Sequence, residues 1–348
     1  MKKLLLSLSL VSGITLFSGS LMAAPLQRTQ VSADAKWLVH LDMDALRKST
    51  FGSTILQFAL TQAGDTLKRE MKIDLPALVA QTGSITVYGN DFKPGLNGPN
   101  GRGVLIFQGS KAVEQVVSGI LIQQAEAAKA GQGSVKALSE GLDPVYSVMP
   151  NLFVAVRPGQ GILVSPKPDQ IEEACRIIEG KAPSLEGTTT FSEYATLPGG
   201  FFFLALAEGF ARDAGLPPQA QVLKLAEGGR IALGESTDKL QLSVSLKAQT
   251  TEGAVQIQQV VQGLIALASL ADVDEPELIE VKKWVGGAKV DAKEKLVSLN
   301  LAVPVAAALK QLSAAADVEI NIPSGKETSP APATPPVPAP VPAIEPAR

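Results

Sequence analysis

The chain has very little cysteine, histidine and aromatic side chain. Its 348 residues include one Cys and one His, and aromatic residues make up 5%. The single cysteine, Cys175, excludes an internal disulfide, and we expect it to be a small buried residue on a helix. His40 lies far from Cys175 in the sequence, so a Cys–His catalytic pair is not expected. The scarcity of aromatics also disfavours a stacking platform for sugars or single-stranded nucleic acid.

The sequence also lacks the residue patterns of nucleic-acid-binding proteins, serine hydrolases and phosphate-binding loops. The formal net charge is −3, and lysine and arginine do not gather in runs, so we expect no nucleic-acid partner. No Gly-x-Ser-x-Gly elbow is present for a serine hydrolase. The glycine-rich stretch 95–103 lacks the Gly-Lys-Ser/Thr of a phosphate loop and reads as a long hairpin loop. We therefore expect neither an enzyme nor a bound cofactor.

The N-terminus has the three parts of a secretory signal peptide. Lys2 and Lys3 precede an uncharged apolar stretch, and small residues follow it up to Ala24. We expect cleavage after Ala23 and therefore a periplasmic or secreted protein. The apolar stretch is shorter than the ~20 residues that span a bilayer. No later segment is expected to cross a membrane, because the apolar stretch 254–271 carries four glutamines and reads as an amphipathic or core helix.

The C-terminal residues 324–348 differ in composition from the rest of the chain. Proline recurs at almost every second or third position from Pro330 to Pro346. Proline removes a backbone donor and fixes φ, so this stretch cannot form a helix or a central strand. We expect a disordered, polyproline-like tail, which could act as a spacer, as a ligand for a proline-binding partner, or without a dedicated partner.

Between these ends, hydrophobic periodicity predicts an α+β body in which hairpins form antiparallel sheets with helices on one face. The predicted strands are 37–43, 84–90, 102–108, 145–149, 152–157, 161–165, 200–207, 229–235, 239–248, 288–292 and 296–302. The predicted helices are 51–71, 75–81, 112–129, 170–179, 217–225, 253–271, 276–285 and 304–312. Ser110 and Thr251 are the expected N-caps of two of these helices.

The order of elements repeats, which predicts a tandem duplication with units at 31–182 and 183–315. One segment supports it in sequence: Val113–Ile120 (VEQVVSGI) aligns with Ile257–Leu264 (IQQVVQGL). Gln, Val, Val and Gly are identical in the two segments, and each lies on a predicted helix before a hairpin. A chance match of two amphipathic helices is the alternative, since a short match alone is weak evidence.

His40, Asp42 and Asp44 are the most suggestive polar residues. At i, i+2 and i+4 of a strand they would point to one face, and imidazole and carboxylates are ligands for a divalent metal. The simpler interpretation is that Val39, Leu41 and Met43 face the core. His40 and Asp42 would then face water, and Asp44 would cap the next turn, Ala45–Lys48.

The stretch Ala33–Arg47, ADAKWLVHLDMDALR, is similar to the start of a group of uncharacterised exported bacterial proteins. Their mature chains open with an "Asp-Ala-x-Trp-x-x-His-x-Asp" strand and continue in the element order described here. The resemblance implies an exported, duplicated α+β protein. It brings no established activity and no catalytic residues.

Three functions follow from these observations as hypotheses. The first is a non-enzymatic cell-envelope protein that binds another envelope protein or a surface through its sheet faces or loops. The second is a carrier or binding protein for an apolar small molecule or lipid, held between sheet and helices. The third is a metal-dependent enzyme centred on His40, Asp42 and Asp44. The sequence does not indicate the oligomeric state.

Overall fold

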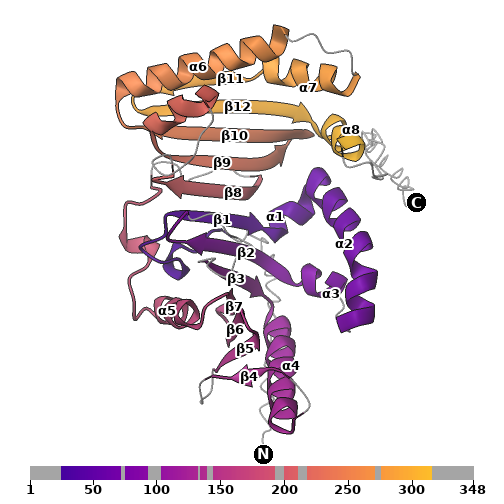
Figure 1. Ribbon diagram of the computed structural model, residues 1–348. Helices are drawn as coiled ribbons and strands as arrows, with labels where there is room; N and C mark the ends of the chain where they lie inside the picture. Colours follow the sequence, from indigo (N-terminus) through magenta and orange to yellow (C-terminus); the bar gives the residue numbers. More distant parts are fainter. Residues whose placement is uncertain are drawn as a thin grey trace, which may run out of the picture.

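A computed structural model describes residues 25–71, 75–92, 103–131, 134–138, 144–192, 200–210, 218–270 and 276–315. The predicted signal peptide, the glycine-rich stretch up to residue 102 and the proline-rich tail lie outside these residues. The body is α+β, as predicted, and its strands form one antiparallel sheet (Figure 1). Its strands are β1 Trp37–Asp42, β2 Thr82–Gly89, β3 Val104–Gly109, β4 Lys136–Ala137, β5 Val145–Met149, β6 Leu152–Arg157, β7 Gly161–Ser165, β8 Phe201–Glu208, β9 Ala226–Ser236, β10 Lys239–Ala248, β11 Lys289–Lys293 and β12 Leu296–Pro304.

The helices lie at the ends and on the faces of this sheet (Figure 1). The α-helices are α1 Met43–Lys48, α2 Thr50–Met71, α3 Leu75–Ala80, α4 Lys111–Lys129, α5 Pro168–Ile178, α6 Thr251–Leu270, α7 Pro276–Gly286 and α8 Val305–Ala315. Three short 3-10 helices are η1 Arg28–Gln30, η2 Leu185–Gly187 and η3 Pro218–Leu225. The segment predicted as an α-helix at 217–225 is therefore a 3-10 helix, and β4 was not predicted.

The strand order is β11-β12-β10-β9-β8-β1-β2-β3-β7-β6-β5-β4. The two predicted units meet where β1 pairs with β8, the first strand of each unit. From this pair the order on one side is β2, β3, β7, β6, and on the other side it is β9, β10, β12, β11. Each side thus contains the second, third, last and next-to-last strand of its unit in that order. In each unit the third strand, β3 or β10, is followed in the chain by a long helix, α4 or α6. The matching order agrees with a tandem duplication, which stays a prediction.

Pairing registers show which side chains share a face, because directly opposed residues point the same way. Ile106, Leu163 and Ala155 lie opposite one another on β3, β7 and β6 and form one buried core with α5. Their sequence neighbours face the other way, where Phe107, Ile162 and Val156 pack with α4. Continued through β2, β1, β8, β9, β10 and β12, the same registers place α6 on the α4 side. Helix α5 therefore lies on the opposite face from α4 and α6, so the helices are not confined to one face as predicted.

Local capping explains where two long helices begin. The Ser110 hydroxyl accepts a hydrogen bond from the Val113 amide at 3.3 Å, which confirms the predicted cap of α4. The expected cap of α6 is off by one residue. Thr251 already lies inside the helix, and the Thr250 hydroxyl accepts the bond from the Gly253 amide at 3.0 Å.

Helix α2 begins with a contact from the other half of the chain. The carboxylate of Glu235 on β9 accepts hydrogen bonds from the amides of Thr50 and Phe51 at 3.0 and 2.8 Å. A carboxylate at a helix N-terminus satisfies free amides and interacts favourably with the helix dipole. The Phe51 ring also stacks on Phe202 of β8, with ring centroids 6.5 Å apart. These contacts join the two predicted units beyond the β1–β8 pair.

Candidate functional site

The three predicted metal ligands have separate partners. His40 Nδ1 lies 2.9 Å from the Thr86 hydroxyl on β2. Asp42 is the N-cap of α1, and its Oδ1 accepts the Ala45 amide at 2.8 Å. Asp44 lies in the first turn of α1 and pairs with Arg47 of the same helix.

The simpler interpretation is reversed for β1 itself, and only Met43, which begins α1, is buried as predicted. His40 and Asp42 are buried, whereas Val39 and Leu41 are partly exposed, so the polar side of β1 faces the protein interior. The cap of α1 is Asp42 and not Asp44. Within the described ranges, no group of three or more His, Cys, Asp or Glu side chains could hold a metal ion.

Cys175 is buried on α5, in the core cluster that this helix forms with the sheet. Its neighbours there include Ile171 one turn away and the adjacent Ala174, as the helical spacing predicted. A thiol in such apolar surroundings is held as an inert packing residue.

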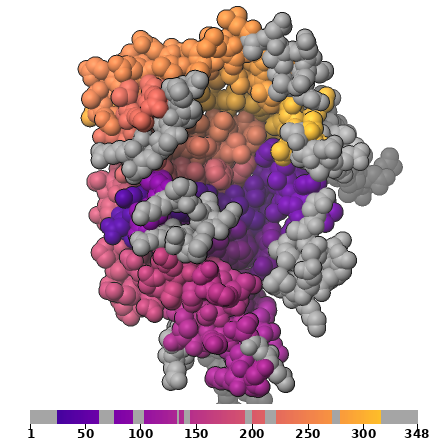
Figure 2. Space-filling view, viewed as in Figure 1, coloured from indigo at the N-terminus to yellow at the C-terminus, as the bar shows by residue number. Residues whose placement is uncertain are grey.

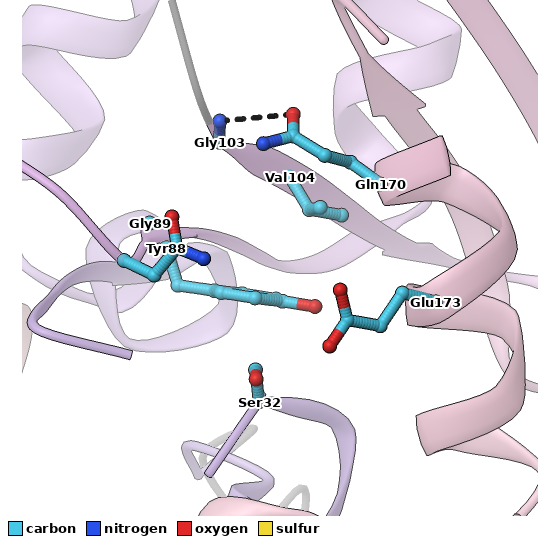
Figure 3. Close-up of a pocket in the computed structure, with 8 residues that line it drawn as sticks. Ser32, Tyr88, Gly89, Gly103, Val104, Gln170 and Glu173 are labelled. Carbon is cyan, nitrogen blue, oxygen red and sulfur yellow. Dashed lines mark hydrogen bonds between the residues drawn. The ribbon is translucent and has the colours of Figure 1, made fainter. Parts of the chain in front are cut away.

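A small cavity lies where α5 meets β2 and β3, lined among others by Ser32, Tyr88, Val104 and Glu173. Figure 3 shows the Tyr88 hydroxyl and the Glu173 carboxylate pointing toward one another across it. Burial, followed by the nearby charge of Glu173, raises the pKa of Tyr88, so its phenol stays protonated. The cavity measures about 30 Å³, which is room for a water molecule and not for an organic ligand.

A much larger feature is the part of the sheet face between α4 and α6. Its outward side chains are almost all aliphatic and are partly exposed, and none belongs to a buried core cluster in the described part of the chain. We call this set the open apolar face. It consists of Val39, Leu41, Ile85, Val87, Leu105, Phe203, Ala205, Ile231, Leu233, Leu242, Val244, Leu299 and Leu301. Ile231, near its centre, is 48% exposed.

The two helices that flank this face also turn apolar side chains to solvent. On α4 these are Val116, Ile120 and Ile122. On α6 the exposure grows toward the C-terminal end, where Leu267 is 66% and Leu270 80% exposed. Figure 2 shows α6 as an orange ridge along the top of the molecule.

Helix α6, predicted as an amphipathic or core helix, has most of its side chains exposed. It is long and apolar enough to cross a membrane by length and composition, yet only 17% of its most apolar window is buried. Its buried side consists of Gly253, Ala254 and Ile257 in the first two turns. No charged residue follows Glu252 in this helix, so its exposed surface beyond the first turn is uncharged.

The sequence of β1 contains part of the signal for this surface. Its alternation predicts one apolar and one polar side, and the apolar side is expected to face the core, as is usual when a sheet has one wet face. The structure instead leaves Val39 and Leu41 on the partly exposed side.

Comparisons with known proteins add little. No protein-family model matches the chain, and no curated protein gives a significant match. Among solved structures, crystal forms I, III and IV of TP0453 align with TM-scores of 0.41, 0.43 and 0.44 at 11% identity. These alignments cover 84%, 84% and 83% of this chain and 98%, 99% and 97% of the other. A likeness at this level carries no argument about function.

Proposed function

We propose that the protein is an exported, non-enzymatic envelope protein that binds lipid, with acyl chains lying on the open apolar face. The observation that carries the proposal is that a continuous row of aliphatic side chains across the central strands stays partly exposed. Large exposed apolar patches mark binding surfaces, because exposing them to water is unfavourable. Export rests on the signal-like N-terminus.

The composition of this surface favours acyl chains over a protein partner. Protein interfaces concentrate their binding energy in Trp, Tyr and Arg, while Leu and Val are under-represented among such residues. The residues of the open apolar face include none of those three types; Trp37 shares their side of β1 but lies at the end of the strand, where its indole N–H donates to the Asp91 carbonyl oxygen at 2.7 Å. Beyond Glu252, the exposed side of α6 adds only aliphatic residues, small residues and glutamine. A flexible hydrocarbon chain needs only such a non-directional surface.

The test is lipid uptake by the purified mature chain. The protein would be mixed with phosphatidylethanolamine vesicles that contain pyrene-labelled phosphatidylglycerol, and loss of excimer fluorescence would report transfer of lipid to the protein. We expect uptake by the unmodified chain and a several-fold loss in Ile231→Gln, because an amide at that position has to be desolvated under the acyl chain.

A matched control separates this surface from exposed apolar residues in general. Leu312 on α8 is 39% exposed but lies away from the open apolar face, so Leu312→Gln should take up lipid like the unmodified chain. No uptake by any form, or equal uptake by all three, would contradict the proposal. Mass spectrometry of an organic extract of the exported protein would show whether lipid is already bound after purification.

A protein-binding role is the second candidate, and one observation favours it. At the aligned positions of α4 and α6, Val116 and Val260 are both exposed, and so are Ile120 and Leu264. Two equivalent apolar stripes would suit a partner with repeated binding segments. Crosslinking in intact cells tests it: a stoichiometric protein partner should be captured by the unmodified chain and lost in the double variant Ile120→Gln/Leu264→Gln. Leu312→Gln is again the control.

A further inference from the structure

A second cavity lies between α4 and the strands β5 and β6, at the far end of the sheet from α6. Its volume is about 590 Å³, within the size range of pockets that hold small organic ligands. Apolar walls come from Ile122 on α4, Pro144 before β5 and Val156 on β6. The lipid proposal does not use this cavity.

A buried carboxylate with spare hydrogen-bonding capacity lies in this cavity. Glu114 is 6% exposed, and its Oε2 accepts a hydrogen bond from the Gly159 amide at 2.7 Å. In the described part of the chain no other group hydrogen bonds or pairs with this side chain, so Oε1 retains its lone pairs. Oε1 is not fully enclosed by the protein, so a ligand in the cavity can reach it and replace the water that otherwise solvates the charge.

A buried phenol provides a second polar group. Tyr146 on β5 is 5% exposed and lines the same cavity. Its hydroxyl makes no hydrogen bond to any group that the structure describes. Burial is the main cause that raises the pKa of Tyr146, followed by the charge of Glu126, so the phenol remains a neutral donor and acceptor.

We propose that this cavity binds a small apolar molecule with a hydrogen-bond-donating head, an amine or an alcohol. The head donates to Glu114 Oε1, and the apolar body lies against Val156 and Ile122 with Tyr146 beside it. An ionised carboxylate only accepts hydrogen bonds, and it repels an anionic head. Lys111 also lines the cavity, but this residue is exposed, so solvent and salt screen its charge. The carboxylate of Glu114 therefore determines which head group binds.

In the second predicted unit, the residue aligned with Glu114 makes a direct hydrogen bond from helix to strand. Gln258 on α6 aligns with Glu114, and its Nε2 donates to the Val290 carbonyl oxygen on β11 at 3.2 Å. The amide thus joins helix and strand without a charge. A glutamine at position 114 is therefore compatible with this helix-on-strand arrangement, which makes Glu114→Gln a conservative test.

The test is calorimetric titration of the full mature chain with three eight-carbon probes: n-octylamine, 1-octanol and sodium octanoate. We expect octylamine and octanol to bind at one site per chain, and octanoate to bind at least about tenfold more weakly because it lacks a donor. Glu114→Gln should weaken octylamine by about tenfold, because a hydrogen bond to a charged group is replaced by one to a neutral amide. Glu172→Gln, at an exposed position on α5, should bind as the unmodified chain does.

Several results would overturn the proposal: no binding of octylamine, equal binding of octanoate, or an unchanged affinity in Glu114→Gln. Ile122 is 51% exposed, so Ile122→Trp should fold normally and block all three probes by occupying the cavity. Ile231→Gln separates this site from the lipid surface. It should bind octylamine normally while losing lipid uptake, and Glu114→Gln should show the opposite pattern.

Discussion

A matched pair of substitutions tests whether the open apolar face is open in solution. Ile85 on β2 belongs to that face and is partly exposed. Ile106 on the neighbouring strand β3 points to the other side, is 1% exposed and lies in the core under α5. The change of both residues to threonine is chemically identical and keeps a β-branched side chain, so strand propensity is nearly unchanged.

The expected losses of unfolding free energy differ because Ile106 is buried away from water and Ile85 is partly exposed. Ile106→Thr removes buried carbon and places a hydroxyl in an apolar core, which should cost about 2–4 kcal/mol of unfolding free energy. At Ile85 the hydroxyl keeps access to water and less apolar area is lost. The cost there should stay below about 1 kcal/mol.

Guanidinium unfolding followed by circular dichroism would measure both values from the shift in midpoint at constant slope. Equal and large costs would mean that Ile85 is covered in solution, and the lipid proposal would lose its basis. A small cost at both positions would instead mean that the core under α5 is loosely packed, against the burial of Ile106.

Three further stability effects are expected, each measured in the same unfolding assay. Glu235→Ala removes the carboxylate that caps α2 and should cost about 1–2 kcal/mol, whereas Glu235→Gln keeps an acceptor and should cost about half as much. Gly161→Ala should cost more than Gly159→Ala, because at φ +118° the new Cβ would also lie 2.9 Å from a carbonyl oxygen of β3, while nothing lies within 4 Å at Gly159. Thr86→Val removes the buried hydrogen bond to His40 Nδ1 and should cost about 1–2 kcal/mol; a neutral result would show that this bond is not needed.

Local features were predictable because they depend on neighbours in the sequence. The strands β5, β6, β7 and β10 have the predicted bounds, since alternation and turn residues define short hairpins. Capping was predictable at Ser110, where a single hydroxyl residue precedes the helix. At α6 two threonines adjoin, and only the backbone geometry decides that Thr250 accepts the bond from the Gly253 amide.

Long-range features were not predictable from the same patterns. Alternation on β1 shows that one side is apolar, but not which side meets the rest of the protein. That choice depends on Thr86, which contacts His40 from the paired strand β2, 46 residues later in the sequence, and on the core cluster around Leu38, to which α5 contributes. The α4 cavity was also missed, because Glu114 reads as an ordinary solvated helix position until Gly159 is folded against it.

The burial of His40 and the exposure of Val39 and Leu41 both follow from the orientation of β1 in the sheet. Side chains alternate along a strand, so a slip of β1 by one residue would bury the two apolar side chains. It would also separate His40 from Thr86. This cross-strand contact therefore favours the register that leaves the apolar side of the strand open. Threonine at the outward positions would preserve strand propensity while exposing less hydrocarbon, so the aliphatic residues there are the feature that the lipid proposal explains.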